Sequence, residues 1–389
     1  MPTGDRRPTV ALVAVSLGHQ PGLGHKLAEL VSTTSDRFRY VAIASHVPSD
    51  VRDHVQWHRI APARGPLRLR WAAFFVRASL ALRAQQRDLV HVVGPSPLVA
   101  APVDLATVIF HWAAYDRAVR RGGEHRGPTV EAIGRWAMRK LERRCYRPGR
   151  VRMLATVSEP ARQDLATAAS GVPVALTPEG VDCRRFRPNP AVRRQVRAAR
   201  GVGQDEVVAV FVGLERRNTK GLRLAIRAFA RARAAGTGPT RLWVLGTAGA
   251  RWRRLATSLG VEPEVEQLGF RNDVERFLAA ADVFVLPTVY EAFCRAAHEA
   301  AACGLPVVAP PVHAVAELVG QDEAGLSVPR DIDSIANALS LLAGDADLRA
   351  RLGAEGRRRA LAVGNGGYPQ AVARLYEQLL AGPVIAGPA

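Results

Sequence analysis

The sequence predicts an α/β protein built from two Rossmann-like domains. Its 389 residues are about two to three times the length of a typical single domain. Each half of the chain alternates short apolar, β-branched runs with segments of helical character, which is typical of a mostly parallel sheet covered by helices. Hydrophobic residues make up 48% and charged residues 23% of the chain, a balance that can fill two cores.

The first half begins with a strand, a glycine-rich turn and a helix. The run PTVALVAVS is followed by Gly18, Gly22 and Gly24 and then by the helical segment HKLAELVSTT. Further apolar runs, expected to be strands, lie at residues 40–47, 89–94, 105–112 and 151–158.

The second half repeats this alternation. Its expected strands lie at residues 207–213, 241–247, 265–270, 283–288, 306–310 and 325–329. Between the halves, the basic, proline-containing segment 184–206 is interpreted as a hinge region. Near the end, the sequence YPQAVARLYEQLL predicts an amphipathic helix.

Composition and motif searches narrow the class of protein. The four cysteines form no CxxC pair, which argues against a zinc knuckle or a disulfide scaffold and fits a reducing compartment. The chain contains neither a P-loop motif nor HExxH, and the DID sequence at 331–333 is interpreted as a helix cap rather than a metal-binding pair. Without a membrane-length apolar run or a signal-peptide cleavage pattern, we expect a cytoplasmic protein.

The positive charge is concentrated in one half of the sequence. Residues 1–200 carry 33 basic and 15 acidic side chains, whereas residues 201–389 carry 21 and 20. This favours one basic domain beside a neutral one over a uniformly basic nucleic-acid binder, so no nucleic acid is expected. The arginine-rich stretches 64–87 and 117–152 contain aromatic residues and could lie on an anionic membrane at its inner face. They could equally be core helices whose arginines reach the surface.

The segment 284–310, FVLPTVYEAFCRAAHEAAACGLPVVAP, carries the strongest functional signal. Glu291 follows an apolar strand, and Glu299 comes eight residues later. If that stretch is helical, about 12 Å separates the two carboxylates, which suits two ends of an extended ligand better than an acid/base pair. The amides near Phe293, Cys294 and Arg295 would form a helix N-terminus that favours hydroxyls or phosphate. A solvated helix with a buried alanine face is the alternative.

This Glu-x7-Glu pattern, followed by EAAACGLPVVAP, resembles the donor-site signature of family 4 retaining glycosyltransferases of the GT-B fold. Similar segments lie at 154–165, 178–188, 210–230, 268–288 and 313–331. The resemblance implies two Rossmann-like domains facing each other across a cleft. They would be an acceptor-binding domain at 1–188 and a nucleotide-sugar-binding domain at 204–365, with a C-terminal helix at 366–382 packing back toward the first domain.

The resemblance also implies roles for individual residues at the donor site. Glu291 would hydrogen-bond the donor sugar, and Glu299 would bind the ribose hydroxyls. Lys220, with Arg216, would neutralise the leaving diphosphate, so neither a metal nor another cofactor is expected. Backbone amides at Phe293 and Cys294 would help to bind the donor.

Two further positions belong to the N-terminal half. His111, in VIFHW, matches the family histidine near the reacting sugar, although a lone histidine after a strand is more often structural. The Gly22–Gly24 turn would lie against donor phosphates or acceptor, but a turn that needs a positive φ explains the same glycines.

The sequence departs from the family pattern in three places, one of which, EGVD for NGVD at 179–182, is given no function. Leu214, rather than arginine, follows Gly213, and the family's EGFG is EAFC here, so Ala292 and Cys294 add Cβ atoms that narrow the sugar pocket.

The expected activity is retaining transfer of a hexosyl group from a nucleotide-diphosphate sugar to an acceptor hydroxyl. The acceptor would be lipid-linked or anionic, as in a cell-envelope glycan or glycolipid, or a small soluble metabolite. An inactive scaffold that binds membrane or nucleic acid, and a nucleotide-sugar epimerase or phosphorylase, remain as alternatives.

Overall fold

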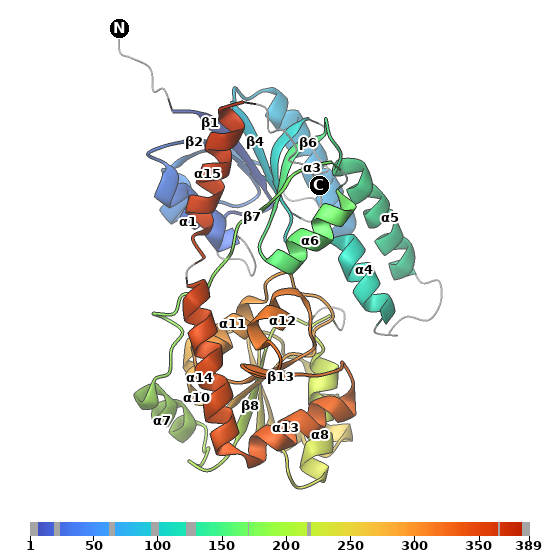
Figure 1. The fold of residues 1–389 in the computed structure, drawn as a ribbon, viewed down its shortest axis with the longest axis vertical. Coiled ribbons are helices and arrows are strands. Elements are labelled where there is room, and N and C mark those ends of the chain that lie inside the picture. Colours follow the sequence, from blue (N-terminus) through green and yellow to red (C-terminus); the bar gives the residue numbers. More distant parts are fainter. Residues whose placement is uncertain are drawn as a thin grey trace. The chain divides into compact units, whose positions relative to one another are not determined.

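The computed structural model describes residues 7–18, 24–61, 67–94, 101–121, 130–169, 171–215, 219–364 and 366–382. The chain folds into two compact units. Unit 1 comprises Met1–Glu179 together with Gly367–Ala389, and unit 2 comprises Gly180–Gly366. In each unit, helices cover a central sheet (Figure 1).

Unit 1 contains a seven-stranded parallel sheet with strand order β3-β2-β1-β4-β5-β6-β7. Its strands are β1 (Thr9–Ala14), β2 (Arg39–Ala44), β3 (Val55–Arg59), β4 (Leu89–Val93), β5 (Val103–Thr107), β6 (Val151–Thr156) and β7 (Val174–Leu176). Its helices are α1 (Gly24–Thr34), α2 (Ser49–Arg52), α3 (Leu67–Arg83), α4 (Trp112–Arg121), α5 (Val130–Cys145), α6 (Glu159–Ala168) and α15 (Tyr368–Leu380).

The pleat of β1 explains why both faces of this sheet are covered. Val10 and Leu12 pack in one core with α1 and α15, whereas Ala11 and Val13 pack in a second core with α3 and α6. Side chains alternate between the two faces of a strand, so a strand buried on both faces must be apolar throughout, as TVALVA is.

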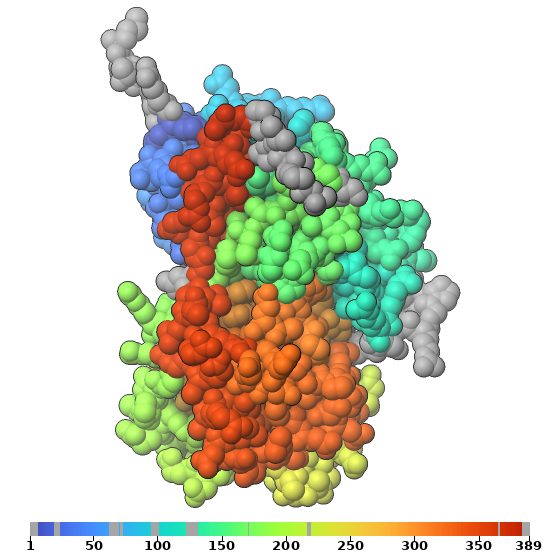
Figure 2. Space-filling model, in the orientation of Figure 1, coloured from blue at the N-terminus to red at the C-terminus, as the bar shows by residue number. Residues whose placement is uncertain are grey.

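The C-terminal helix α15 is an integral part of unit 1. His91 of β4 is fully buried, with its Nδ1 2.6 Å from the Tyr376 hydroxyl and its Nε2 2.8 Å from Thr107 Oγ1. Burial lowers the pKa of His91 to about 3, so this hydrogen-bonded ring is neutral. Arg152 adds a hydrogen bond to the carbonyl of Leu379, at 2.9 Å. In Figure 2 this helix is the red segment on the surface of unit 1.

Unit 2 contains a six-stranded parallel sheet with strand order β10-β9-β8-β11-β12-β13. Its strands are β8 (Val208–Val212), β9 (Arg241–Leu245), β10 (Val265–Gly269), β11 (Val283–Val285), β12 (Val307–Ala309) and β13 (Gly325–Ser327). Its helices are α7 (Pro190–Ala199), α8 (Leu222–Ala234), α9 (Ala250–Ser258), the 3₁₀ turn η1 (Glu262–Glu264), α10 (Val274–Ala280), α11 (Arg295–Ala302), α12 (His313–Val319), α13 (Ile332–Gly344) and α14 (Ala346–Val363). The prediction of two Rossmann-like domains is confirmed.

The segment 184–206, interpreted above as a hinge, lies within unit 2 and contains α7. Asn189 caps this helix by accepting a hydrogen bond from the Val192 amide at 3.1 Å, and Pro190 occupies its first turn. Arg197 is fully buried and donates a hydrogen bond to Asp282 at 3.1 Å. Asp282 directly precedes β11, so this bond connects α7 to the start of that strand. The arginines of this segment therefore belong to unit 2, and the surplus of positive charges is 12 in unit 1 and 7 in unit 2.

None of the helices in the described parts of the chain combines the length and apolar character needed to span a membrane.

Candidate active site at the carboxyl edge of the second sheet

The strand order of unit 2 places side by side two loops that carry predicted site residues. β8 lies between β9 and β11, and successive connections from this point run in opposite directions, which is where doubly wound sheets bind ligands. The loop after β8 carries Lys220, and the loop after β11 carries Glu291. Lys220 Nζ donates a hydrogen bond to Glu291 Oε1. Thr288 Oγ1 also donates to this oxygen, at 3.2 Å. The structure thus brings two of the sequence-predicted site residues together.

The electrostatics of this pair keep the lysine charged. Burial lowers the pKa of Lys220, but the nearby acidic groups, Glu291 foremost, together more than offset it, and the pKa lies above its ordinary value. Lys220 is therefore a protonated ammonium at neutral pH, paired with Glu291.

The backbone around Gly221 fixes the position of Lys220. Gly221 has a φ of +81°, and a Cβ there would lie 2.1 Å from the carbonyl oxygen of Pro287. The Thr219 carbonyl accepts hydrogen bonds from the Val289 amide at 2.8 Å and from Thr288 Oγ1 at 3.1 Å. The two loops are therefore held together by backbone contacts as well as by the ion pair.

Glu215, which the sequence analysis did not single out, supports the loop that carries Lys220. Its Oε2 accepts a hydrogen bond from the Leu222 amide at 3.0 Å, at the start of α8. Its own amide donates to Thr247 Oγ1 at 2.6 Å. The residue before α8 is Gly221, which has no side chain to cap the helix. A helix that begins after glycine can be capped by a side chain from elsewhere in the chain, and this absence of a local cap is the signal that could have pointed to Glu215.

The EAFC turn leads from Glu291 into α11. Cys294, the residue before the helix, has a left-handed backbone (φ +66°, ψ +69°), which explains why the related pattern has glycine there. Its carbonyl accepts hydrogen bonds from the His298 amide at 3.2 Å and from His298 Nδ1 at 3.0 Å. The Phe293 ring stacks on His298 with centroids 4.0 Å apart. Burial raises the pKa of the Cys294 thiol well above its usual value, so the thiol stays protonated.

Glu299 lies on α11, one turn after Arg295. Its side chain is 12% exposed, and its Oε1 accepts a hydrogen bond from Arg295 Nη2 at 3.2 Å. Burial raises the pKa of Glu299, while Arg295 lowers it. Glu291 thus lies in the turn before α11, and Glu299 lies on α11 itself.

In unit 1, His111 is buried directly before α4. Glu142 of α5 accepts hydrogen bonds from the amides of Trp112, at 2.8 Å, and Ala113, at 3.2 Å. Its Oε2 also lies 3.7 Å from His111 Nε2. Burial raises the pKa of Glu142 to about 8 although both amides lower it. Sequence reasoning missed Glu142, because its contact with His111 depends on the packing of α4 against α5.

Of the two glycines predicted to line the donor phosphates or the acceptor, only Gly24 belongs to the described residues. Gly24 is the first residue of α1, and a Cβ there would lie 2.4 Å from the carbonyl oxygen of Gly18. This close approach accounts for glycine at position 24. Gly22 and Arg216 lie outside the described residues, so their predicted roles stay predictions.

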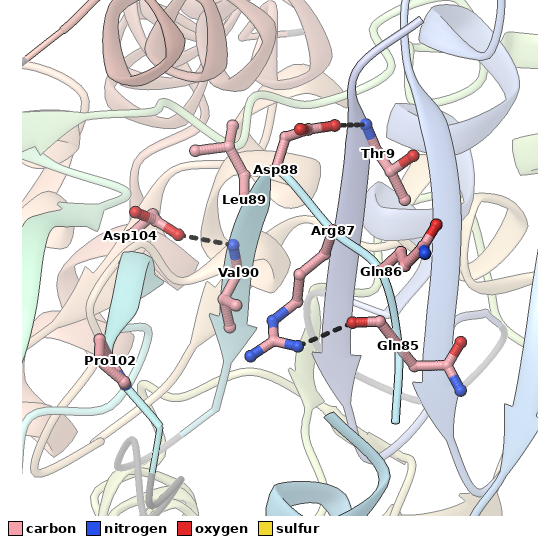
Figure 3. A pocket seen from close by; sticks show the side chains of 9 residues that line it. All are labelled: Thr9, Gln85, Gln86, Arg87, Asp88, Leu89, Val90, Pro102 and Asp104. Atoms are coloured by element: carbon pink, nitrogen blue, oxygen red, sulfur yellow. Dashed lines mark hydrogen bonds between the residues drawn. The ribbon is translucent and has the colours of Figure 1, made fainter. Parts of the chain in front are cut away.

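A cavity of about 660 Å³ lies elsewhere, at the amino ends of β4 and β5 in unit 1 (Figure 3). Its polar groups are engaged within the fold. Asp88 accepts a hydrogen bond from the Thr9 amide at 2.7 Å, and Asp104 accepts one from the Val90 amide at 2.8 Å. Ligands of doubly wound sheets bind at the opposite, carboxyl ends of the strands.

The described residues contain no group of three His, Cys, Asp or Glu side chains that could hold a metal ion. Asp331 accepts a hydrogen bond from the Ser334 amide at 2.8 Å and thereby caps α13. The interpretation of the DID sequence as a helix cap is confirmed.

Known proteins resemble both the sequence and the fold. The family model described as "Glycosyl transferases group 1" matches residues 206–345. The MMP alpha-(1->4)-mannosyltransferase of Mycolicibacterium hassiacum is 31% identical over 315 residues, which cover 75% of this chain and 70% of that protein. The D-inositol 3-phosphate glycosyltransferase of Saccharomonospora viridis is 35% identical over 195 residues, or 46% of this chain and 44% of that protein.

Solved structures share the two-unit architecture. WaaG, a glycosyltransferase involved in lipopolysaccharide biosynthesis, superimposes with a TM-score of 0.78 at 20% identity, covering 94% of this chain and 99% of WaaG. Anabaena HepE in complex with UDP-glucose gives a TM-score of 0.69 at 18% identity, covering 96% and 100% of the two chains. These similarities show the GT-B fold. Together with the mannosyltransferase match over most of both chains, they show that this protein is a glycosyltransferase of the group 1 family.

Proposed function

We propose that this protein transfers a hexosyl group from a nucleotide-diphosphate sugar to an acceptor hydroxyl, with retention of configuration at the anomeric carbon. The observation that carries the proposal is the Lys220–Glu291 pair at the β8–β11 edge, with Glu299 on the following helix. A cation for the diphosphate and two carboxylates for hydroxyls are the groups that such a donor requires. The retaining course follows from the family resemblance.

Each residue has a distinct part in the proposed reaction. Lys220, with Arg216, stabilises negative charge on the diphosphate as the glycosidic bond breaks, without a metal ion. Glu291 orients the sugar through its hydroxyls, and Glu299 accepts hydrogen bonds from the ribose. For His111, whose Nε2 lies 3.7 Å from Glu142 Oε2, the resemblance implies a role near the reacting sugar. Among solved neighbours, the HepE complex with UDP-glucose supports a nucleotide-sugar donor.

We propose an anionic or lipid-linked acceptor, because the described surface of unit 1 combines positive charge with exposed apolar side chains. Asp116 is buried and binds Arg120 and Arg135, each at 2.9 Å, and also Arg139, so this cluster keeps a net positive charge. Burial raises the pKa of Asp116, but these three arginines outweigh it and hold the pKa below its usual range. One relative is named for D-inositol 3-phosphate, a phosphate-bearing compound.

Exposed apolar side chains occur in both arginine-rich stretches. Val76 and Leu80 of α3, and Ile133 and Trp136 of α5, point to solvent. Lys140 lies over the Trp136 ring, 5.9 Å from its centroid. Exposed aromatic and aliphatic groups beside cations are typical of a surface that rests on an anionic bilayer, and we propose peripheral binding to the inner face of the cell membrane.

The proposed donor chemistry is tested in two steps. A thermal-shift panel of UDP, GDP, ADP and their sugars identifies the donor, since a ligand at 100 times its Kd stabilises the folded chain by about 2.7 kcal/mol. Hydrolysis of that donor without acceptor, followed by NMR of the released sugar before mutarotation, then gives the stereochemical course. Retention and activity in EDTA are expected. An inverted product, or activity that needs Mg²⁺ or Mn²⁺, contradicts the proposal, and failure to bind any nucleotide supports an inactive scaffold.

A further inference from the structure

Arg295 occupies an unusual position at the start of α11. It is the first residue of the helix, where unpaired amides and the helix dipole already create positive potential, and the first turn contains no acidic residue. A cation is electrostatically disfavoured at such a position. Its side chain is only about one-third exposed, at 34%, so it lies partly along the protein rather than extending fully into water.

The guanidinium of Arg295 is directed at Glu299. Its Nη2 donates to Glu299 Oε1 at 3.2 Å across one helical turn. The other carboxylate oxygen, Oε2, takes no part in this contact. This contact therefore fixes the carboxylate by one oxygen and leaves the other for a ligand.

The surroundings of Glu299 raise the pKa of its carboxyl group above the ordinary value. Burial raises its pKa, and Glu275 of α10 raises it further, while Arg295 and Arg185 lower it. Arg185 is itself bound to Glu275, with its Nη2 2.8 Å from Oε2, so its charge is largely compensated. The neighbouring Cys303 thiol has a pKa raised by burial to about 12 and remains neutral. Arg295 is therefore the main group that lowers the pKa of Glu299 against the effect of burial.

We propose that Arg295 is a positioning residue for nucleotide recognition, which holds Glu299 as an oriented carboxylate that accepts hydrogen bonds from both ribose hydroxyls of the donor. The inference rests on the proposed function, in which Glu299 binds the ribose. Protonation would turn one oxygen of Glu299 into a hydroxyl donor and remove its charge, and rotation would turn its oxygens away, so either change would weaken the hydrogen bonds from the adjacent hydroxyls. Arg295 thus acts on the nucleotide through Glu299.

The test compares ribonucleotides with their 2′-deoxy forms. Dissociation constants of UDP, GDP and ADP and of dUDP, dGDP and dADP are measured by calorimetry at pH 5.5, 6.5, 7.5 and 8.5. The wild type should prefer the ribonucleotide by about tenfold or more, because the deoxy form lacks a hydrogen bond to a charged group. The preference should decline as the pH falls and Glu299 takes up a proton.

Two variants and a control isolate Arg295. In Arg295→Met the preference should shrink severalfold, and its decline should begin at higher pH, because the pKa of Glu299 rises further. Arg295→Lys should restore part of the preference. The control Arg351→Met removes an exposed arginine of α14 and should behave as the wild type.

The outcomes separate this inference from the proposed function. An unchanged ribonucleotide preference in Arg295→Met would overturn the inference alone. Equal weakening of ribo and deoxy forms at every pH would also overturn it, since Arg295 would then contact the diphosphate directly. A wild type that binds nucleotides without any ribose preference would instead overturn the assignment of Glu299 to the ribose.

Discussion

Lys220 and Glu291, 71 residues apart, form an ion pair where the loops after β8 and β11 meet. In the free protein each group neutralises the other. A nucleotide-diphosphate sugar would offer phosphate to the lysine and hydroxyls to the glutamate. Binding of the proposed donor would therefore replace the Lys220–Glu291 ion pair with one contact from each residue to the ligand.

Lys220→Met should weaken binding of the nucleoside diphosphate by roughly 10- to 150-fold, which corresponds to about 1.5–3 kcal/mol for lost charge-assisted hydrogen bonds. Glu291→Gln should leave diphosphate affinity within a fewfold of the wild type, because its proposed partner is the sugar. Calorimetric titration with the diphosphate measures both. Equal losses in the two variants would show that the pair acts only as a structural contact.

Substitution of the two glutamates should affect different kinetic constants. Glu299→Ala should mainly weaken donor binding, by about 1.5–3 kcal/mol. Glu291→Ala should lower kcat more than donor affinity, because orientation of the sugar matters most in the transition state. Steady-state kinetics with varied donor distinguish the two effects. Normal binding and turnover in both variants would place the donor site elsewhere.

Gly221→Ala should destabilise unit 2 far more than Gly236→Ala. Both glycines have similar positive φ angles, +81° and +73°, but an added Cβ at Gly236 meets nothing within 4 Å, whereas at Gly221 it meets the Pro287 carbonyl. The φ cost alone is about 1 kcal/mol, and the clash should add about 1–3 kcal/mol at Gly221. Hydrogen exchange of the β8 amides measures the difference. Similar values for both variants would show that the loop relaxes without cost.

The stability contributed by Glu142 should fall as the pH rises. Its pKa is about 8 in the folded protein against an ordinary 4.5, so the folded state holds its proton more tightly than the unfolded state. Wild type should therefore lose stability relative to Glu142→Gln between about pH 4.5 and pH 8. Urea unfolding of both proteins at pH 5, 6, 7 and 8 measures this difference. A constant difference would mean that Glu142 is ionised throughout this range.

Membrane binding should depend on the exposed apolar residues of unit 1. Replacing Ile133 and Trp136 by serine should reduce co-sedimentation with anionic vesicles, whereas replacing the equally exposed Leu341 and Leu361 of unit 2 should not. Each cation near such a surface adds about 1 kcal/mol and is screened by salt, so binding should weaken at high ionic strength. Equal binding to neutral and anionic vesicles would favour a small soluble acceptor.

The sequence predicted all six strands of unit 2 but only five of the seven in unit 1. The two that it missed, β3 and β7, are the edge strands of their sheet. Interior strands are covered on both faces and appear as apolar runs, whereas VQWHR in β3 is largely accessible and has no such signature. The hinge interpretation of 184–206 failed for a related reason, because the contact of Arg197 with Asp282, 85 residues away, cannot be read from the local sequence.

In the candidate site, too, the sequence reveals residues of local motifs but not those that act through distant contacts. Lys220, Glu291 and Glu299 stand out as candidate site residues from spacing and resemblance, because they belong to local motifs. Glu142 and Glu215 do not, since each caps a helix that begins elsewhere in the chain. The left-handed backbone at Cys294 was also hidden, because the sequence alone gives no reason for a cysteine to adopt it.

The division of unit 1 into two separate segments has a consequence for synthesis on the ribosome. Unit 2 is complete once Gly366 has emerged, whereas unit 1 still lacks α15 at that moment. Until Tyr376 arrives, His91 has one ring nitrogen without its hydroxyl partner, and the core around α1 and Phe38 lacks its cover. Unit 1, although translated first, therefore cannot complete its fold until all of unit 2 has been translated, and its nascent form leaves this part of the core uncovered for that whole time.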